Sequence, residues 1–161
     1  MTEEIVKIPK MDQPEYDRLI REEYVARIAF KGAKYPYIAP FIYVYDGNHM
    51  YFLSTRYGKK IEYFIQNPCV SVEVEKYSPD MSNYAFVSLS GRLVEVRDPD
   101  DKKDIRDSFI RMIMERDLSK NIMTALGHSP KDPFEMIINE ERNVIWKLVN
   151  VNRSTGFKNR T

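Results

Sequence analysis

Residues 51–74 read YFLSTRYGKKIEYFIQNPCVSVEV, and this stretch decides the fold. A strand from Met50 to Ser54 is predicted by its aromatic and apolar residues. Gly58 to Gln66 then carries apolar residues on one helical face, and Asn67-Pro68 ends the helix. From Val70 to Val74, valines alternate with polar residues, as in a strand with one buried face. The stretch therefore predicts strand, basic turn, short helix and strand.

The segments before this stretch predict two more strands and a helix. Tyr35 to Tyr45 reads YPYIAPFIYVY and is apolar on both faces, which indicates a buried strand. Pro40 has no N–H to give to a ladder, so it predicts an edge, a bulge, or a place where something else approaches the backbone. Asp46-Gly47 is a hairpin turn signal. Tyr24 to Phe30 is a further strand, and Asp12-Gln13-Pro14-Glu15 begins a helix.

The segments after it complete an antiparallel pattern. Phe86 to Val96 is a strand whose apolar phase shifts at Gly91, which indicates a bulge or a barrel bend. A helical insertion is expected at about 98–127, with its second helix ending at Gly127, and Val144 to Val151 is the closing strand. From about Arg153 the chain is polar and basic, and we expect this tail to be disordered or to reach a neighbouring subunit. We therefore expect one domain over 1–161, of the α+β class and mainly β, built as a small antiparallel barrel with flanking helices.

Composition excludes several function classes. The 161 residues carry 25 basic and 24 acidic side chains, so the net charge of +1 gives no overall attraction for nucleic acid. No apolar run is long enough to span a membrane. The first residues, MTEEIVKIPK, lack a signal peptide, and Cys69 is the single cysteine, so a cytoplasmic location is expected. Cys69 is expected in the core, His49 and His128 at surface or capping positions, and no metal site is expected.

The turn from Ser54 to Lys60, STRYGKK, is the segment most able to carry chemistry. It places two hydroxyls, a glycine and three cations between a strand and the start of a helix. Hydroxyls, lysines and free helix amides together form a cradle for a phosphate. A solvated basic turn is the alternative, and the turn alone does not decide between them.

The same residues give the chain a resemblance to a known family. Tyr51-Phe52-Leu53-Ser54, Gly58-Lys59-Lys60, Asn67-Pro68 and the valine alternation resemble the FMN-binding split barrels related to pyridoxamine 5′-phosphate oxidase. The resemblance covers residues 24–97 well and 144–157 loosely. It implies an antiparallel split β-barrel of the flavin-reductase type, FMN as cofactor, and a homodimer with the flavin site at the subunit interface.

The resemblance also implies where the cofactor binds. The phosphate is expected at the end of the 50–54 strand and the start of the helix, and the flavin ring along the backbone of 38–43. The implied cofactor-binding residues are Ile38, Pro40, Phe41, Ile42, Tyr43, Leu53, Ser54, Thr55, Lys59 and Lys60. Tyr43 stands where the oxidase has a basic substrate-side residue, and the ending RSTGFKNRT lacks the arginine-rich signature for its substrate. Pyridoxamine phosphate oxidation is therefore not expected, and the sequence names no catalytic residue.

Three functions remain open at this point. The first is an FMN-dependent oxidoreductase that passes electrons from NAD(P)H to a small acceptor, with chemistry supplied by the cofactor. The second is a non-catalytic module that holds or carries a flavin, a deazaflavin or heme. The third is a barrel without a cofactor. Trp146, on the closing strand, is either an aromatic wall near the flavin or a side chain of the barrel core.

Overall fold

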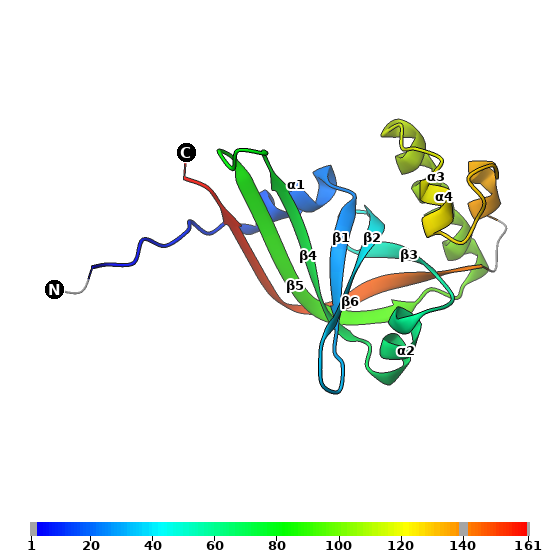
Figure 1. Ribbon diagram of the computed structural model, residues 1–161, viewed down its shortest axis with the longest axis horizontal. Coiled ribbons are helices and arrows are strands. Elements are labelled where there is room, and N and C mark those ends of the chain that lie inside the picture. The colour runs from blue at the N-terminus through cyan, green and yellow to red at the C-terminus, as the bar shows by residue number, and fades with distance from the viewer. Residues whose placement is uncertain (1–2, 139–141, 161) are drawn as a thin grey trace.

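The computed structural model describes residues 3–138 and 142–160. Its elements are α1 Gln13–Glu22, β1 Val25–Phe30, β2 Tyr37–Tyr45, β3 Met50–Thr55, α2 Lys59–Gln66, β4 Cys69–Tyr77, β5 Tyr84–Glu95, α3 Pro99–Glu115, α4 Ile122–Ala125, the 3₁₀ turn η1 Phe134–Ile137, and β6 Asn143–Lys158. The strands are antiparallel and close into a barrel in the order β1-β2-β3-β6-β5-β4 (Figure 1). The predicted antiparallel barrel with flanking helices is confirmed.

Strand β6 closes the barrel because it is long enough to pair with two neighbours. Its first part pairs with β3, from Thr55 opposite Asn143 to Tyr51 opposite Lys147, and it then runs along β5 as far as Lys158. The segment from Arg153 is therefore ordered, and the expectation of a disordered tail was wrong, whereas contact of this segment with a neighbouring subunit remains a prediction. Backbone pairing with β5 orders this segment, and its polar side chains face solvent, so composition alone did not reveal the strand.

Two apolar cores hold the molecule together. One fills the barrel and includes Phe30, Phe52 and Trp146, which are fully buried. The other lies between the outer face of β2, β3 and β6 and the helical insertion, whose Phe109 is fully buried there. Figure 1 shows α3 and α4 standing beside that part of the barrel. The part of this outer face that carries Ile42, Leu53 and Ile145 is therefore covered rather than solvated.

Local signals explain the ends and bends of the elements. Asp12 and Glu15 form the predicted capping box at the start of α1. The register of β5 against β6 shifts between Ser90 and Arg92, so the predicted bulge at Gly91 is confirmed. A Cβ on Gly91 would lie 2.8 Å from the Val149 carbonyl oxygen, which explains why the close approach needs glycine.

Three side-chain expectations can now be checked. Trp146 lies in the barrel core, edge-on to Phe30 with ring centroids 5.9 Å apart. Cys69 is exposed rather than packed in the core. In β4 the side chains of Val70, Val72 and Val74 point into the barrel, so the side chain of Cys69 points outward. His128 is buried rather than at the surface, directly after α4, where its backbone N–H donates to Met123 O.

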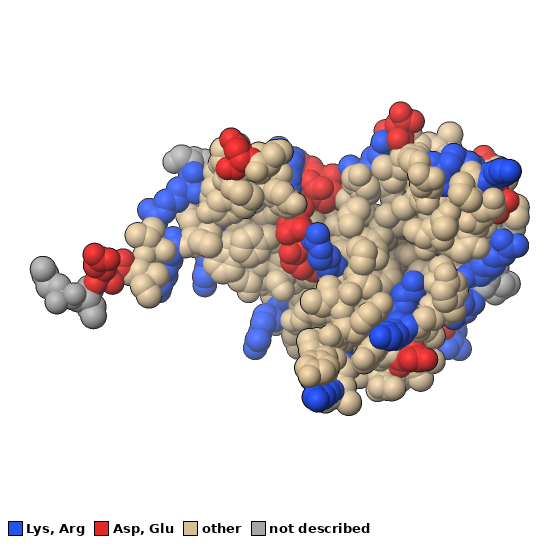
Figure 2. All heavy atoms as spheres, viewed as in Figure 1, with Lys and Arg blue, Asp and Glu red and all other residues tan. Residues whose placement is uncertain are grey.

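The surface carries mixed charges. On the face shown in Figure 2, Lys and Arg side chains are scattered among acidic and uncharged residues and do not form one continuous basic area. None of the helices in residues 3–138 and 142–160 is long and apolar enough to cross a bilayer.

Candidate functional site

A pocket of about 230 Å³ lies between β2, β3, the first turn of α2, and α4. Its walls are formed by Val25, Pro40, Phe41, Ile42, Leu53, Ser54, Lys60, Ile122, Ala125 and Leu126. Two of these residues, Ser54 and Lys60, are polar, and the others are apolar. The pocket thus joins six of the predicted cofactor-binding residues, contributed by two strands and a helix that are separate in sequence.

The pocket opens where β2 and β3 part. The ladder between these strands runs from Tyr45 opposite Met50 to Tyr43 opposite Phe52 and stops there. Among the strands of the described residues, the first half of β2, residues 37–42, therefore pairs with β1 alone. This divergence leaves one backbone edge of β2 free beside the pocket.

Proline fits this edge for a reason that follows from strand geometry. The Tyr43 N–H donates to Tyr24 O on the β1 side at 2.9 Å. Backbone groups point to alternate sides along an antiparallel strand, so those of Ile38, Pro40 and Ile42 point to the free edge. Pro40 therefore costs the ladder no hydrogen bond, in agreement with the prediction of an edge open to something other than a strand.

The polar end of the pocket is formed by Ser54 and Lys60. Ser54 is 2% exposed, and its hydroxyl donates to Thr55 O at 3.1 Å. The Lys60 ammonium is half-buried and lies 5.8 Å from the centroid of the Phe41 ring. Burial lowers the pKa of Lys60. No carboxylate of the described residues lies within ion-pair distance of this ammonium, so its partly desolvated charge is available to an anion.

The start of α2 adds further donors. Gly58 stands at its N-cap with φ of +99°, and no side chain caps the helix. The positive φ favours glycine, and the first-turn amides of α2 are left without a side-chain acceptor. These amides belong to the turn that contains Lys59 and Lys60, and Lys60 lines the polar end of the pocket.

Four predicted residues lie outside the pocket wall. Ile38 is exposed on the outer face of β2, and Lys59 is exposed and lines a different cleft. Thr55 is buried, and its methyl group lies toward Gly127 rather than toward the pocket. The Tyr43 side chain points into the barrel, where its hydroxyl donates to Ile20 O at 2.6 Å and burial raises its pKa. Only the backbone of Tyr43 can therefore lie against a flavin ring, and the expected contribution of Tyr43 to cofactor binding remains a prediction.

Sequence reasoning missed the wall that α4 supplies. Ile122, Ala125 and Leu126 come from the insertion, and α4 ends at Gly127 with φ of +86°. The helix stop at Gly127 was visible in the sequence. Nothing in the sequence indicated which strands the insertion would cover, because that depends on packing across the outer face.

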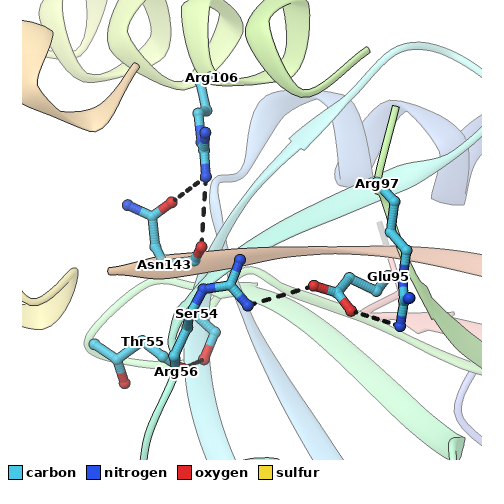
Figure 3. A network of polar contacts seen from close by, with 7 residues as sticks. All are labelled: Ser54, Thr55, Arg56, Glu95, Arg97, Arg106 and Asn143. Carbon is cyan, nitrogen blue, oxygen red and sulfur yellow. Dashed lines mark hydrogen bonds and ion pairs between the residues drawn. The ribbon is translucent and has the colours of Figure 1, made fainter. Parts of the chain in front are cut away.

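A polar network fixes the insertion next to the pocket (Figure 3). Arg106 of α3 is buried and donates to the side-chain oxygen of Asn143 at 3.0 Å. Asn143 begins β6 and lies opposite Thr55 of β3. Nearby, Arg56 and Arg97 lie 3.5 and 3.2 Å from carboxylate oxygens of Glu95. The contact of Arg106 with Asn143 ties α3 to the start of β6, which pairs with β3 next to the pocket.

Across the described parts of the chain, no group of three or more His, Cys, Asp or Glu side chains is placed to hold a metal ion. The arrangement instead offers an apolar slot with a cationic, hydroxyl-bearing end. Such a slot can hold a planar organic group that carries a phosphate.

Solved structures share this fold. A FAD-binding protein from Mesorhizobium loti has 22% identity and a TM-score of 0.71, and the match covers 96% of this chain and 100% of that one. A FAD-binding protein from Mycobacterium smegmatis has 15% identity and a TM-score of 0.62, with 94% and 100% covered. The heme storage protein of Vibrio cholerae has 12% identity and a TM-score of 0.65, with 88% and 92% covered. At these identities the likeness shows the fold alone.

Sequence comparison shows the family. An uncharacterized protein of Rhizobium meliloti is 29% identical over 86 residues, which span 53% of this chain and 56% of that protein. The chain therefore matches little more than half the length of this relative. The model of the family described as pyridoxamine 5′-phosphate oxidase matches residues 12–135, which include the barrel from β1 to β5 and all of the strand residues of the pocket. The chain belongs to the pyridoxamine 5′-phosphate oxidase family.

Proposed function

We propose that this chain binds FMN in the pocket between β2, β3 and α4, and that the bound flavin passes electrons from a nicotinamide donor to a small acceptor. One observation carries the proposal: Lys60 is half-buried beside the buried Ser54 and has no carboxylate partner in the described part of the chain. A partly desolvated cation in the wall of an apolar slot is stabilised by an anion. The FAD-binding proteins of the same fold support a flavin as the molecule that brings it.

The pocket residues fit the parts of FMN. Ser54, Lys60 and the first-turn amides of α2 would hold the phosphate. Pro40, Ile42 and Leu53 would lie against the ring, whose polar edge would meet the free backbone edge of β2. When bound, the flavin supplies reversible electron transfer, while Ile122 and Leu126 exclude water from one side. Family membership does not carry the oxidase activity, and at Tyr43 the structure has a buried phenol where the oxidase has a basic residue.

A heme-binding role is less well supported by the pocket. Heme iron needs an axial ligand such as His, Cys, Met or Tyr. The ten residues that line the pocket include none of these types. A flavin needs no such ligand, so the lining favours flavin over heme.

We propose further that the working unit is a homodimer with the flavin site at the interface. The outer face next to the pocket exposes apolar side chains: Val25 is 43% exposed, Ile38 is 61% exposed, and Pro40 is exposed between them. The register places Ile42 opposite Val25, Pro40 opposite Arg27 and Ile38 opposite Ala29, so these apolar side chains share one face of β1 and β2 with Arg27, which is paired with Glu75. A second copy packed here would cover this face and close the open side of the pocket.

The site is tested by replacing Lys60 with Gln and titrating the protein with FMN, followed by flavin fluorescence. Loss of one charge-assisted hydrogen bond, worth about 1.5–3 kcal/mol, lowers FMN affinity by about 10- to 100-fold. Lys59→Gln is the matched control, since Lys59 lies outside the pocket wall, and it should change FMN affinity by less than about threefold. Unchanged affinity in Lys60→Gln would refute the site, and a protein that retains no flavin after FMN is added would refute the function. Anaerobic bleaching of the bound flavin by NADH or NADPH tests the redox role.

A further inference from the structure

A second cleft lies on the other side of the first turn of α2. It has a volume of about 340 Å³ and is lined by Ala33, Lys34, Tyr35, Lys59, Glu62, Tyr63 and Gln66. One wall is the loop between β1 and β2, and the other is one face of α2. We call it the α2 cleft. The consecutive residues Lys59 and Lys60 thus line two different spaces next to the start of one helix.

The α2 cleft carries two cations that the protein itself does not neutralise. Lys34 and Lys59 both line it, and neither lies within ion-pair distance of a carboxylate in residues 3–138 and 142–160. Glu62 lines the same cleft without pairing with either lysine. The positive charge here is therefore free to bind an anion, close to the uncapped amides of α2.

The cleft also has aromatic walls. Tyr35 is 69% exposed, and the Lys34 ammonium lies 5.2 Å from the centroid of its ring. Tyr63 stacks on Tyr37, with ring centroids 5.5 Å apart and planes 7° apart. An exposed ring next to a cation is a platform on which a planar base can stack.

The shape of the cleft is built into the loop. A Cβ on Gly32 would lie 1.9 Å from Tyr35 O and 2.9 Å from the Tyr63 ring. The loop can therefore turn against α2 only with glycine at this position. This contact sets the position of Lys34 and Tyr35 relative to Lys59, so the two walls face each other through the fold itself.

We propose that the α2 cleft binds the nucleoside phosphate half of a dinucleotide, with the phosphate between Lys34 and Lys59 and the base on Tyr35. The inference rests on the proposed function, because the other half of the dinucleotide belongs at the flavin pocket. Two molecules could supply this nucleoside phosphate. One is FAD, whose adenylate half would lie in the cleft while its two linked phosphates reach Lys60 and Lys59. The other is the nicotinamide donor, whose nucleotide half would lie there. Glu62 fits a ribose with free hydroxyls, which can donate to a carboxylate, and opposes a ribose that carries a further phosphate.

The test uses the full chain with Lys34 and Lys59 both replaced by Gln, and Lys31→Gln as control, because Lys31 is exposed in the same loop but does not line the cleft. Affinities for FMN, FAD and ADP are measured by titration, and flavin reduction is measured as a function of NADH concentration. For an FAD site, the wild type binds FAD at least about tenfold more tightly than FMN, and the double variant loses this advantage while FMN affinity stays within about twofold. For a donor site, the double variant raises the KM for NADH at least about fivefold and leaves both flavin affinities unchanged.

Two results would overturn the inference. One is a double variant that alters neither FAD affinity nor the KM for NADH. The other is an equal loss of FMN and FAD affinity, which would place Lys59 at the first phosphate instead. Titration with ADP separates this inference from the proposed flavin site. If FMN binding does not depend on Lys60 while ADP binding still depends on Lys34 and Lys59, the flavin site fails and the nucleotide cleft stands.

Discussion

Lys60 is the residue whose protonation links the pocket to pH. Burial lowers its pKa in the free protein, and a bound phosphate stabilises the protonated form and raises it again. FMN affinity should therefore be constant below the pKa of Lys60 in the free protein and should fall by up to about tenfold per pH unit above it. Dissociation constants measured between pH 7 and 10 check this. In Lys60→Arg, whose guanidinium stays protonated, the decline should vanish, and an identical decline there would assign the titration to another group.

Single residues also show where sequence reasoning reaches its limit. The sequence singled out Ser54 and Lys60, which both line the pocket, because hydroxyl and cation types at a strand end are visible without a structure. It grouped Lys59 with Lys60, although successive residues of a helix point about 100° apart and the two lysines enter different clefts. The sequence does not show that the Tyr43 side chain points into the barrel core. Only its backbone can therefore line the pocket, and this becomes visible once the inward-facing residues of β2 are known.

At the scale of elements, the bulge in β5 should be sensitive to a single added carbon. Gly91→Ala would bring a Cβ to 2.8 Å from Val149 O and 3.0 Å from the Leu148 side chain. We expect a loss of about 1–3 kcal/mol in the free energy of unfolding and a drop of about 3–10 °C in Tm, measured by thermal unfolding followed by circular dichroism. Ser88→Ala, an exposed position of the same strand, is the control. A Gly91→Ala protein as stable as that control would show that the bulge relaxes freely.

Most elements could be predicted because their signals are local. The capping box of α1, the helix stop at Gly127 and the phase shift at Gly91 each depend on a few neighbouring residues. The second half of β6 could not be predicted, because its side chains are polar and its order comes from hydrogen bonds to β5. The position of α4 over the pocket was also out of reach, since it depends on how Phe109 and Ile113 pack on strands far away in sequence.

At the scale of the whole molecule, the apolar outer face of β1 and β2 should hold two copies together. Ile38→Glu would place a charge on this face, and burying it against a partner without a counter-ion is unfavourable. We expect the variant to be a folded monomer with weakened FMN binding, measured by light scattering coupled to size-exclusion chromatography and by FMN titration. Ile5→Glu is the control, because Ile5 is exposed on the N-terminal extension away from the barrel (Figure 1). A dimeric Ile38→Glu protein would place the subunit interface elsewhere.

The pairing of β6 with both β3 and β5 has a consequence for how the chain folds during synthesis. On the ribosome, β3 and β5 emerge before β6, and each has an open edge until residues 143–158 arrive. Open edges pair readily with other chains, so the nascent protein passes through an aggregation-prone interval. The barrel can close only after its longest strand is released, and the Met11 N–H then donates to Gly156 O and joins the segment before α1 to β6.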